Sequence, residues 1–421
     1  MKPSGDGEPQ RLTLDERMKR CCMIRQADYP ACSRLRKEVA ALTAKGYEVD
    51  VICAHNGSRI PYETSGPITV HRIRLNRRRT GIVRYLFEYG LFFCQAAVKV
   101  SFLHFRRQYR FVQVNSMPDF LVFAATVPKL LGAKLVLDLH EPAPELFSTL
   151  LGHHHRTLIR LVAFCEQVSI RFADTVITVT DQMKENCVRR GADPSKISVI
   201  LNVPALEFDR GAAELARANG NGHLSLVCHG AMLKRYGQDV AIRAVDIVRK
   251  SIPHVVLNIL GYGDYESELI KLANELGLNS HVRFLGYLPF NDMMHRIATA
   301  DIGIVPVEKN AYSDLVHTNK MFELIAMHKP VVISRTKAVE SFFGSGCDCL
   351  KYFKSGDAAE LAKCIMELHQ DPDAVTSMTR NAFARYQAFS WKNTQHQYCR
   401  VVESGALKKT SDQLSWPARG Q

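Results

Sequence analysis

Three strand ends in the second half of the chain carry residues that could bind an anion. Each follows a short apolar run and is rich in glycine, in polar or basic residues, or in both. Glycine lets a backbone approach a phosphate closely, and a helix N-terminus with a nearby Lys or Arg completes an anion site. The sequence therefore predicts a phosphate site, with Gly230, Arg235, Gly261, Gly263, Thr318, Asn319 and Lys320 as its candidate residues.

One carboxylate, Glu323, lies in the amphipathic segment that follows the last of these strand ends. With Lys320 three residues before it, Glu323 could form a solvated ion pair worth a few tenths of a kcal/mol. Alternatively, it could accept hydrogen bonds from both hydroxyls of a ribose, as an acidic residue does in dinucleotide-binding folds. Residue type and spacing leave both interpretations open.

A second candidate group lies in the first half, where the apolar run over residues 134–140 ends in His140 and Glu141. A carboxylate and an imidazole at a strand end could orient or deprotonate an acceptor hydroxyl. The alternative is a pair that only hydrogen-bonds its neighbouring loop. We expect His140 and Glu141 to belong to an acceptor-side catalytic site.

Two parallel sheets would position these residues. Short apolar runs alternate with amphipathic segments along the chain, which predicts α/β domains with parallel sheets covered on both faces. Ligands of such sheets bind beyond the carboxyl ends of the strands. The alternation stops over residues 206–222, which are polar, and then restarts. We predict two doubly wound domains, residues 18–205 and 223–386, joined by a linker over 206–222.

The composition is that of a globular protein, with 46% hydrophobic and 23% charged residues. Lys and Arg number 55 against 42 Asp and Glu, and the net charge of +13 favours a phosphate-bearing partner. A nucleotide, a membrane surface and nucleic acid all fit this charge, but no nucleic-acid-binding motif accompanies it. Twelve scattered cysteines without a CxxC motif, and no visible secretory leader, predict free thiols in the cytoplasm.

Residues 71–110 form the most basic stretch. Glu88 is their only acid, and aromatic residues are interleaved with the cations. A basic, aromatic, amphipathic segment suits the headgroup layer of an anionic membrane. The alternative is a helix with aromatic residues in the core and solvated arginines. We expect membrane docking through the ten cations Arg72, Arg74, Arg77, Arg78, Arg79, Arg84, Lys99, Arg106, Arg107 and Arg110.

Five segments of the second half, in their order and spacing, resemble the donor domain of the family 4 retaining glycosyltransferases. They are HGAMLKRYGQDVAIRA, NILGYGD, VRFLGYLP, ADIGIVPV and NKMFELIAMHKPVV. In the first half, ADYPACSRLRKEVAALTAKGYEVDVI, VLDLHEPAPELF and KISVILNVP are similar to the family's other domain. The resemblance implies the GT-B fold, two Rossmann-like domains facing across a cleft. It also implies that residues 387–403 form a helix that crosses back to the first domain, before a disordered tail over 404–421.

The resemblance implies a role for Glu323, which matches the second glutamate of the family's E-x7-E motif. That glutamate binds the ribose of the donor nucleotide. The chain departs from the motif at the first glutamate, where it has Leu315, and the neighbouring Asp314 is out of register.

The family's basic pair after the first strand of the donor domain is only partly matched, because Ala231 stands where an Arg is common. We therefore expect Arg235 and Lys320 to bind the diphosphate, without a metal ion. The DxD sequence Asp371-Pro372-Asp373 is interpreted as a turn and not as a metal site.

We thus expect a retaining glycosyltransferase that moves a sugar from a UDP- or GDP-sugar to a saccharide or lipid-linked saccharide, in cell-surface polysaccharide assembly. We expect a cytoplasmic protein, peripheral at the inner face of the membrane, with no nucleic-acid partner. A nucleotide-sugar hydrolase or epimerase of the same fold remains an alternative. So does a catalytically silent nucleotide-binding scaffold, which the loss of the first glutamate at Leu315 would suit.

Overall fold

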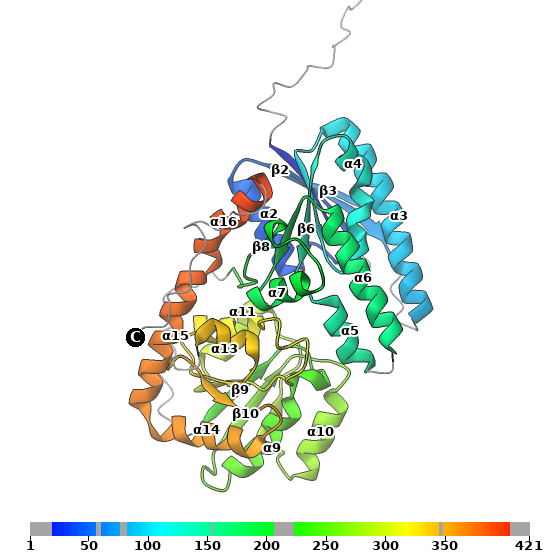
Figure 1. Ribbon diagram of the computed structural model, residues 1–421. Coiled ribbons are helices and arrows are strands. Elements are labelled where there is room, and N and C mark those ends of the chain that lie inside the picture. Colours follow the sequence, from blue (N-terminus) through cyan, green and yellow to red (C-terminus); the bar gives the residue numbers. More distant parts are fainter. Residues whose placement is uncertain are drawn as a thin grey trace, which may run out of the picture. The chain divides into compact units, whose positions relative to one another are not determined.

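The computed structural model describes residues 19–55, 60–75, 82–152, 155–205, 223–344 and 348–404. Its contacts divide the chain into two units, shown in Figure 1. Unit 1 comprises the residues up to Ile200 and those from Gln395 onward, and unit 2 comprises Leu201–Thr394. The predicted linker over 206–222 and residues 405–421 of the predicted tail lie outside the described residues.

Unit 1 contains an eight-stranded sheet in the order β3-β4-β2-β1-β5-β6-β7-β8, in which only β3 pairs antiparallel to its neighbour. Most positions of its central strands are apolar and buried, which is the pattern of a parallel sheet covered on both faces. The strands are β1 Arg20–Arg25, β2 Glu48–His55, β3 Tyr62–Ser65, β4 Ile68–Arg74, β5 Phe111–Asn115, β6 Lys134–Leu139, β7 Thr175–Thr178 and β8 Ile197–Val199.

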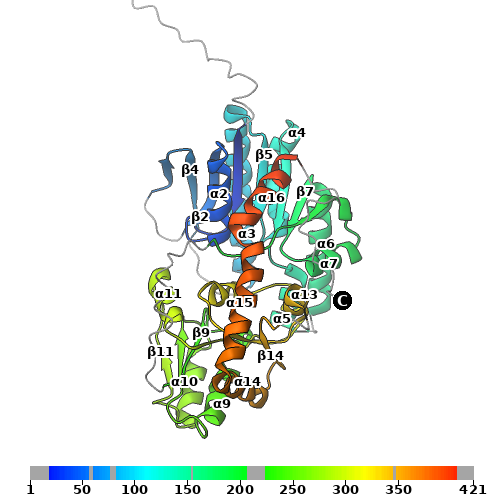
Figure 2. The ribbon, with the colours of Figure 1, turned by 90° about the vertical axis from the view of Figure 1, so that its left-hand side faces the viewer.

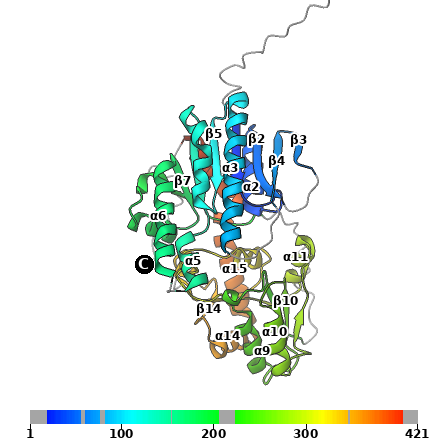
Figure 3. The same ribbon diagram turned by 90° about the vertical axis from the view of Figure 1, so that its right-hand side faces the viewer.

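Helices cover the unit 1 sheet on both faces. Helices α2 (Ser33–Ala44) and α16 (Trp391–Ser404) lie on one face, as Figure 2 shows. On the other face lie α3 (Ile82–Arg107), α4 (Thr126–Leu130) and α6 (Arg156–Phe172), seen in Figure 3. The unit also contains the 3-10 helices η1 (Asp119–Ala125) and η3 (Pro194–Lys196), and the helices α5 (Ala143–Leu151) and α7 (Asp181–Arg189).

The C-terminal helix is anchored in unit 1 by a buried hydrogen bond. The Tyr398 hydroxyl donates to Gln113 Oε1 over 2.7 Å, with Gln113 on the central strand β5. The Cys399 thiol lies beside the Ala41 carbonyl of α2. The last described residues of the chain therefore belong to unit 1, which also contains the first strand, β1.

Unit 2 contains a six-stranded, fully parallel sheet in the order β11-β10-β9-β12-β13-β14. The strands are β9 Ser225–His229, β10 Val256–Leu260, β11 Val282–Phe284, β12 Ile302–Val305, β13 Val331–Ser334 and β14 Lys351–Phe353. Order reverses beside β9, the first strand of the unit, because β10 and β12 lie on its two sides. In open parallel sheets, ligands bind at the carboxyl ends of the strands at such a switch point.

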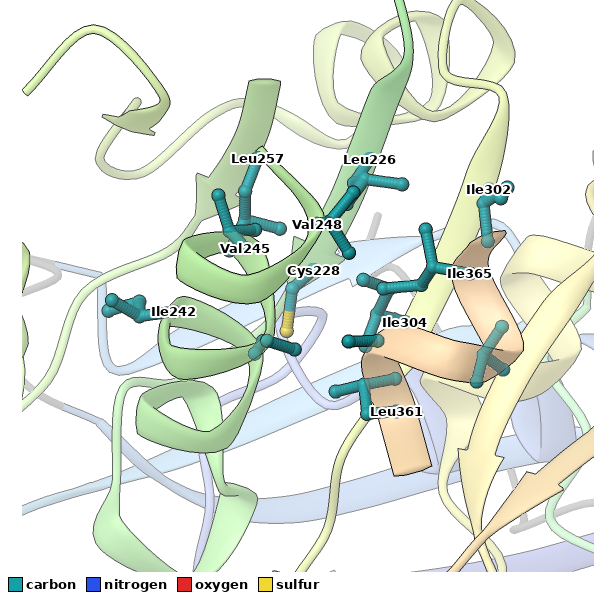
Figure 4. Close-up of a cluster of buried hydrophobic side chains, with 14 of the residues drawn as sticks. Leu226, Cys228, Ile242, Val245, Val248, Leu257, Ile302, Ile304, Leu361 and Ile365 are labelled. Carbon is teal, nitrogen blue, oxygen red and sulfur yellow. The ribbon is translucent and has the colours of Figure 1, made fainter. Parts of the chain in front are cut away.

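Two buried clusters fill unit 2, one on each face of its sheet. The first packs α9 (Gln238–Val248) and α14 (Ala358–Gln370) onto the sheet through residues such as Ile242, Val245, Leu226 and Ile365 (Figure 4). The second is built from the helices α11 (Phe290–Ala298), α12 (Asn319–Ala326), α13 (Lys337–Phe343) and α15 (Pro372–Phe389). The remaining elements are η4 (Lys234–Tyr236) and α10 (Glu266–Glu275).

The basic stretch over residues 71–110 is not one amphipathic element. Its first residues belong to strand β4, where His71 is buried against Asp50 at 2.8 Å and Arg72 pairs with Glu63 at 2.7 Å. The residues of β4 therefore belong to the sheet, and α3 is the helical part of the stretch that was expected to dock to a membrane. Arg77, Arg78 and Arg79 lie outside the described residues, as does the side chain of Arg84.

The prediction that every cysteine is a free thiol is wrong at one position. Ten cysteines of the described residues are free, but Cys349 is disulfide-bonded. Most of the free thiols are buried, and burial raises the pKa of Cys21, Cys22 and Cys228, so these cysteines act as small apolar core residues.

Candidate functional site

Glu323 does not pair with Lys320. Its Oε2 lies 2.7 Å from Nε2 of His229, the last residue of β9. The histidine side chain is 2% exposed and that of Glu323 is 15% exposed, so the carboxylate remains partly open to solvent. Glu323 is therefore tied to the sheet and not to the surface, as the ligand-binding interpretation requires.

Lys320 lies on the side of Tyr236. Its Nζ is 3.2 Å from the centroid of that aromatic ring, which is a close cation–π contact. The pKa of Lys320 is lowered to about 8, chiefly by burial and also by the nearby Arg235, although Cys228 and Glu323 act in the opposite direction. The amine is therefore still charged at neutral pH but loses its proton more readily than an exposed lysine, and a bound anion would favour its charged form.

Arg235 is the second cation of this group. Its guanidinium carbon lies 5.0 Å from the centroid of the Tyr236 ring, so Arg235 and Lys320 share one aromatic neighbour. The structure thus brings together the two cations that the sequence assigned to a diphosphate. Lys234, the neighbouring cation, is exposed.

The three predicted glycines are required by packing. A Cβ on Gly230, which has a φ of +109°, would lie 2.1 Å from Lys320 Cε. A Cβ on Gly261 would lie 2.1 Å from the Gly230 carbonyl oxygen, and one on Gly263 would lie 2.2 Å from the Met232 carbonyl oxygen. The loops after β9 and β10 therefore interlock, and this contact places the backbone of both loops beside Lys320.

Helix α12 begins in this region. Thr318 is its N-cap residue but makes no side-chain cap hydrogen bond, and Asn319 is its first residue. An uncapped N-terminus leaves backbone N–H groups available to an anion. The predicted residues Thr318, Asn319, Lys320 and Glu323 thus lie within a turn and a half of one helix.

Several buried polar atoms in these loops have no hydrogen-bond partner. They are Nε of Arg235, Oδ1 of Asn319, Oε1 of Gln238 and Nδ1 of His229. Native proteins pair nearly all such atoms, and each exception calls for a reason. A polar ligand at the ends of β9 and β10 would supply partners to several of them.

The missing first glutamate of the E-x7-E motif is not replaced by its neighbour. Leu315 follows an Asx-type turn in which the Tyr312 and Ser313 amides donate to Asn310 Oδ1. The Asp314 carboxylate accepts from the amide of Lys337, the first residue of α13, at 2.9 Å, so it caps the N-terminus of that helix. Asp314 is thus committed to the fold.

At the strand ends of unit 1, charges are paired with one another. Arg34 of α2 donates to both carboxylate oxygens of Asp138 on β6, at 2.6 and 2.7 Å, and lies 3.1 Å from Glu38. Asn115, at the end of β5, donates to Glu38 and to Asp138. All four side chains are buried, and burial with the adjacent Asp138 raises the pKa of Glu38 to about 7.

His140 belongs to this network. Arg25, the last residue of β1, lies 2.8 Å from His140 Nε2 and donates to the Ser116 carbonyl oxygen. Burial, and then the cations Arg25 and Arg34, lower the pKa of His140 well below its usual range. The imidazole is therefore neutral, and the Arg25 guanidinium lies against its ring, with Nη1 2.8 Å from Nε2 and 3.4 Å from Nδ1. Glu141 lies beside it, half-buried.

Two further acidic motifs have structural roles. Glu145 accepts from Arg190 at 2.5 Å and from Asn186 at 2.6 Å, which ties α5 to α7. Asp371 caps α15 by accepting from the Ala374 amide at 2.9 Å, so Asp371-Pro372-Asp373 is a helix N-terminus and not the turn that the sequence suggested.

Sequence reasoning missed three residues of these strand ends. His229 precedes Gly230 directly, and a histidine that ends an otherwise apolar strand was a signal that the strand-end rule could have used. Tyr236 stands between Arg235 and a glycine, but an aromatic residue in a loop has no distinctive spacing. Arg25 ends β1, and only the fold shows that it meets His140.

Comparison with known protein families agrees with the geometry. Residues 33–202 match the model of the glycosyl transferase 4-like domain, and residues 223–371 match that of the glycosyl transferases group 1. The chain belongs to the family 4 glycosyltransferases. The resemblance seen in the sequence is thereby confirmed, and so is the assignment to an enzyme family of glycosyltransferases.

Two curated relatives of this glycosyltransferase come from corynebacteria. The D-inositol 3-phosphate glycosyltransferase of Corynebacterium kroppenstedtii is 27% identical over 265 residues, which cover 58% of this chain and 56% of that protein. The GDP-mannose-dependent monoacylated alpha-(1-6)-phosphatidylinositol monomannoside mannosyltransferase of Corynebacterium glutamicum is 26% identical over 214 residues, 50% of this chain and 55% of that protein. The chain spans about half the length of these relatives.

Solved structures confirm the predicted GT-B fold class. The sucrose-phosphate synthase of Thermosynechococcus elongatus superimposes with a TM-score of 0.72 at 18% identity, covering 91% of this chain and 98% of that one. Anabaena Alr3699/HepE in complex with UDP superimposes with a TM-score of 0.68 at 17% identity, covering 92% and 100%. At this level of identity the likeness concerns the fold alone.

Proposed function

We propose that the protein is a retaining glycosyltransferase that transfers a sugar from a UDP- or GDP-sugar to a saccharide or lipid-linked saccharide acceptor in cell-surface polysaccharide assembly. The observation that carries the proposal is the group formed by Arg235, Lys320 and Glu323 at the carboxyl ends of the unit 2 strands. It offers two cations without a carboxylate partner among the described residues, next to a carboxylate that is partly open.

The chemistry of such a transfer suits these residues. As the bond from the sugar to the diphosphate breaks, negative charge develops on the leaving group, and fixed cations with helix amides stabilise it. Arg235, Lys320 and the N-terminus of α12 would supply that stabilisation without a metal ion. Glu323 would accept hydrogen bonds from the ribose hydroxyls. Retention of configuration rests on the family resemblance, and the proposed acceptor-side roles of His140 and Glu141 rest on their residue types at a strand end.

Names of relatives and neighbours leave the donor base open. One relative is named as GDP-mannose-dependent, whereas one structural neighbour was solved in complex with UDP. We therefore propose a nucleoside diphosphate sugar and let experiment decide the base.

A thermal-shift panel of nucleoside diphosphates and their sugars, with Glu323→Ala as the matched variant, tests the proposal. A ligand that binds only the folded state increases the free energy of unfolding by RT ln(1 + [L]/Kd) and thereby raises the melting temperature. We expect one nucleotide to raise the melting temperature of the parent and to lose that effect in Glu323→Ala. A shift in the parent without turnover of any donor would favour the silent nucleotide-binding scaffold, and turnover without acceptor would favour a hydrolase. Absence of any shift would contradict the proposed donor site.

We also propose that the protein is peripheral at the inner face of an anionic membrane, through helix α3. Its exposed apolar residues recur at intervals of three, four or seven positions and so lie on one side of the helix: Phe87, Leu91, Val98, Phe102 and Phe105. Arg106 lies 4.2 Å over the Phe102 ring, and Lys99 is exposed nearby. A helix with this mixture of apolar and basic residues suits a headgroup layer.

The neighbouring helices continue this surface. Leu130 of α4 is 80% exposed and Phe164 of α6 is 64% exposed, and both helices lie on the same face of the sheet as α3 (Figure 3). Within the described residues of α3, α4 and α6, no carboxylate is exposed, which suits an anionic lipid surface. No helix of the described residues is long and apolar enough to cross a bilayer.

Co-sedimentation with vesicles tests the membrane proposal. We expect the parent to bind phosphatidylglycerol-containing vesicles and not pure phosphatidylcholine, and the double variant Phe102→Ser, Phe105→Ser to bind several-fold less. Ile270→Ser, which removes an exposed apolar residue of α10 in unit 2, serves as control. Equal binding by the double variant and the control would contradict docking through α3.

A further inference from the structure

We propose that His229 is a positioning residue that fixes the Glu323 carboxylate in the orientation that a ribose needs. The inference rests on the proposed function, because it assigns a partner within the same donor site. What it adds is that ribose recognition depends on a side chain from the sheet, which does not itself touch the ligand.

In the hydrogen bond between the two side chains, His229 is the donor and Glu323 is the acceptor. An ionised carboxylate only accepts hydrogen bonds, so the 2.7 Å contact requires a hydrogen on His229 Nε2. The other ring nitrogen, Nδ1, is buried without a hydrogen-bond partner. A hydrogen on Nδ1 would have no acceptor there, so the arrangement favours the tautomer in which Nε2 donates to Glu323.

This contact leaves one oxygen of the Glu323 carboxylate free to accept hydrogen bonds from a ligand. Oε2 is held by the histidine, which restrains both torsions at the end of the glutamate side chain. Oε1 has no hydrogen-bond partner within the described residues of the structure, and it belongs to a side chain that is 15% exposed. A carboxylate held by one oxygen and open at the other can accept from the adjacent hydroxyls of a ribose without first losing rotational freedom.

The two elements that carry the pair are rigid. His229 is the last residue of β9, which is hydrogen-bonded to β10 and β12 on its two sides. Glu323 lies on the second turn of α12, whose residues Met321, Phe322 and Leu324 are buried in the core. The hydrogen bond thus joins a central strand to a packed helix, and these two rigid elements fix the position of the carboxylate.

The helix also offers an alternative partner that the structure does not use. Lys320 lies three residues before Glu323, the spacing at which side chains on a helix meet. Its ammonium group lies instead against the Tyr236 ring. By holding Glu323, His229 keeps the carboxylate available for hydroxyls and the two functions of α12 separate.

Binding of ribose-modified nucleotides tests this role. The probes are the nucleoside diphosphate that binds the parent in the thermal-shift panel, its 2′-deoxy analogue and inorganic pyrophosphate, each measured by calorimetry. A hydrogen bond to a charged group contributes enough to expect about a tenfold preference of the parent for the ribonucleotide. In His229→Phe, which keeps the ring but removes its donor, we expect that preference to be lost, with unchanged affinity for the 2′-deoxy analogue and pyrophosphate.

Two further variants complete the test. His229→Gln can place an amide N–H towards Glu323 and should recover part of the ribose preference. Glu323→Gln should lose the preference in either background, so that the double variant His229→Phe, Glu323→Gln is no worse than Glu323→Gln alone. If His229→Phe weakens all three probes equally, or retains the ribose preference, His229 has no positioning role.

The outcome separates the inference from the proposed function. If the parent binds no nucleotide, or if Glu323→Gln keeps the full ribose preference, the proposed donor site itself is overturned. If Glu323→Gln loses the preference and His229→Phe does not, only the inference falls. Should His229→Phe fail to fold, as judged by its melting curve, His229→Gln and the double cycle with Glu323→Gln still decide.

Discussion

Cations at the strand ends of the two sheets differ in whether they have carboxylate partners. In unit 1, Arg34 is enclosed by Asp138 and Glu38, so a buried cation and two carboxylates satisfy one another. In unit 2, Arg235 and Lys320 meet at the face of Tyr236 and have no carboxylate partner among the described residues. The buried Arg34 of unit 1 is therefore neutralised by carboxylates, whereas, among the described residues, Arg235 and Lys320 of unit 2 are not.

This difference indicates which edge is built for a charged ligand. A cation already paired in the interior has no free energy to gain from an anion, whereas a partly desolvated, unpaired cation has much to gain. The proposed diphosphate site belongs to unit 2 for that reason. The edge of unit 1, with a neutral His140, is better suited to uncharged hydroxyl groups.

Removing the cation of unit 1 should have the largest effect, and it should be on stability. Arg34→Met leaves two buried carboxylates unpaired, which is expected to lower the free energy of unfolding by about 3–5 kcal/mol. Urea denaturation measures this change, with Lys271→Met, at the exposed Lys271–Glu275 pair, as a control that should change little. A loss below about 1 kcal/mol would show that the network is not internally paired as described.

Removing a cation of unit 2 should instead affect binding. Lys320→Met is expected to lower the affinity for a nucleoside diphosphate by roughly 30- to 100-fold, because a charged hydrogen bond contributes about 2–3 kcal/mol. The exposed Lys234→Met is the matched control and should retain affinity within about twofold. Calorimetry measures both. Equal losses in the two variants would mean that the electrostatic field, and not a defined contact, attracts the nucleotide.

The interlocked loops of unit 2 offer a third test. Gly230→Ala forces a Cβ into Lys320 at a φ of +109°, and should lower the free energy of unfolding by about 2 kcal/mol and displace the amine. Gly277→Ala, at a φ of +63° with no atom within 4 Å of the added Cβ, should cost about 1 kcal/mol. Thermal denaturation compares the two variants. Identical losses in the free energy of unfolding would show that Lys320 does not hinder a side chain at position 230.

The smallest expected effect is a dependence of binding on pH. Lys320 has a pKa of about 8 in the free protein, so it is charged below pH 8 at no cost and must be protonated on binding above that pH. Affinity for the nucleoside diphosphate should therefore be flat from pH 7 to about 8 and then fall by up to tenfold per pH unit. Lys320→Arg should remain flat to pH 9.5, and a parallel fall in both proteins would assign the dependence to another group.

Much of the fold could be predicted because it follows from local pattern. The alternation of apolar runs and amphipathic segments predicted two parallel sheets, and the apolar run over residues 134–140 became strand β6. Helix α2 ends at Ala44, shortly before Gly46, which has a φ of +84°. Strands β3, β4 and β14 were missed. β3 is exposed along its whole length, and β14 is only three residues long, so neither has the apolar alternation on which the prediction depends.

The site was predicted in its residues but not in its pairings. That Arg235, Lys320 and Glu323 come together follows from the strand-end rule. That Glu323 bonds to His229 while Lys320 bonds to Tyr236 depends on side-chain directions across 94 residues of sequence, which spacing cannot give. Likewise, Arg25 meets His140 only because β1 and β6 both flank β5.

The interlock of glycines also constrains how sequences of this kind can diverge. Gly261 has to be glycine because of the carbonyl of Gly230, and Gly230 has to be glycine because of Lys320. A larger residue at Gly230 gains space only if the side chain at position 320 becomes shorter, whereas the obstacle at Gly261 is a backbone carbonyl that no substitution removes. In a saturation library of this protein, tolerated replacements at Gly230 should therefore appear together with a shorter side chain at position 320. Such paired substitutions would show that the two positions are in steric contact.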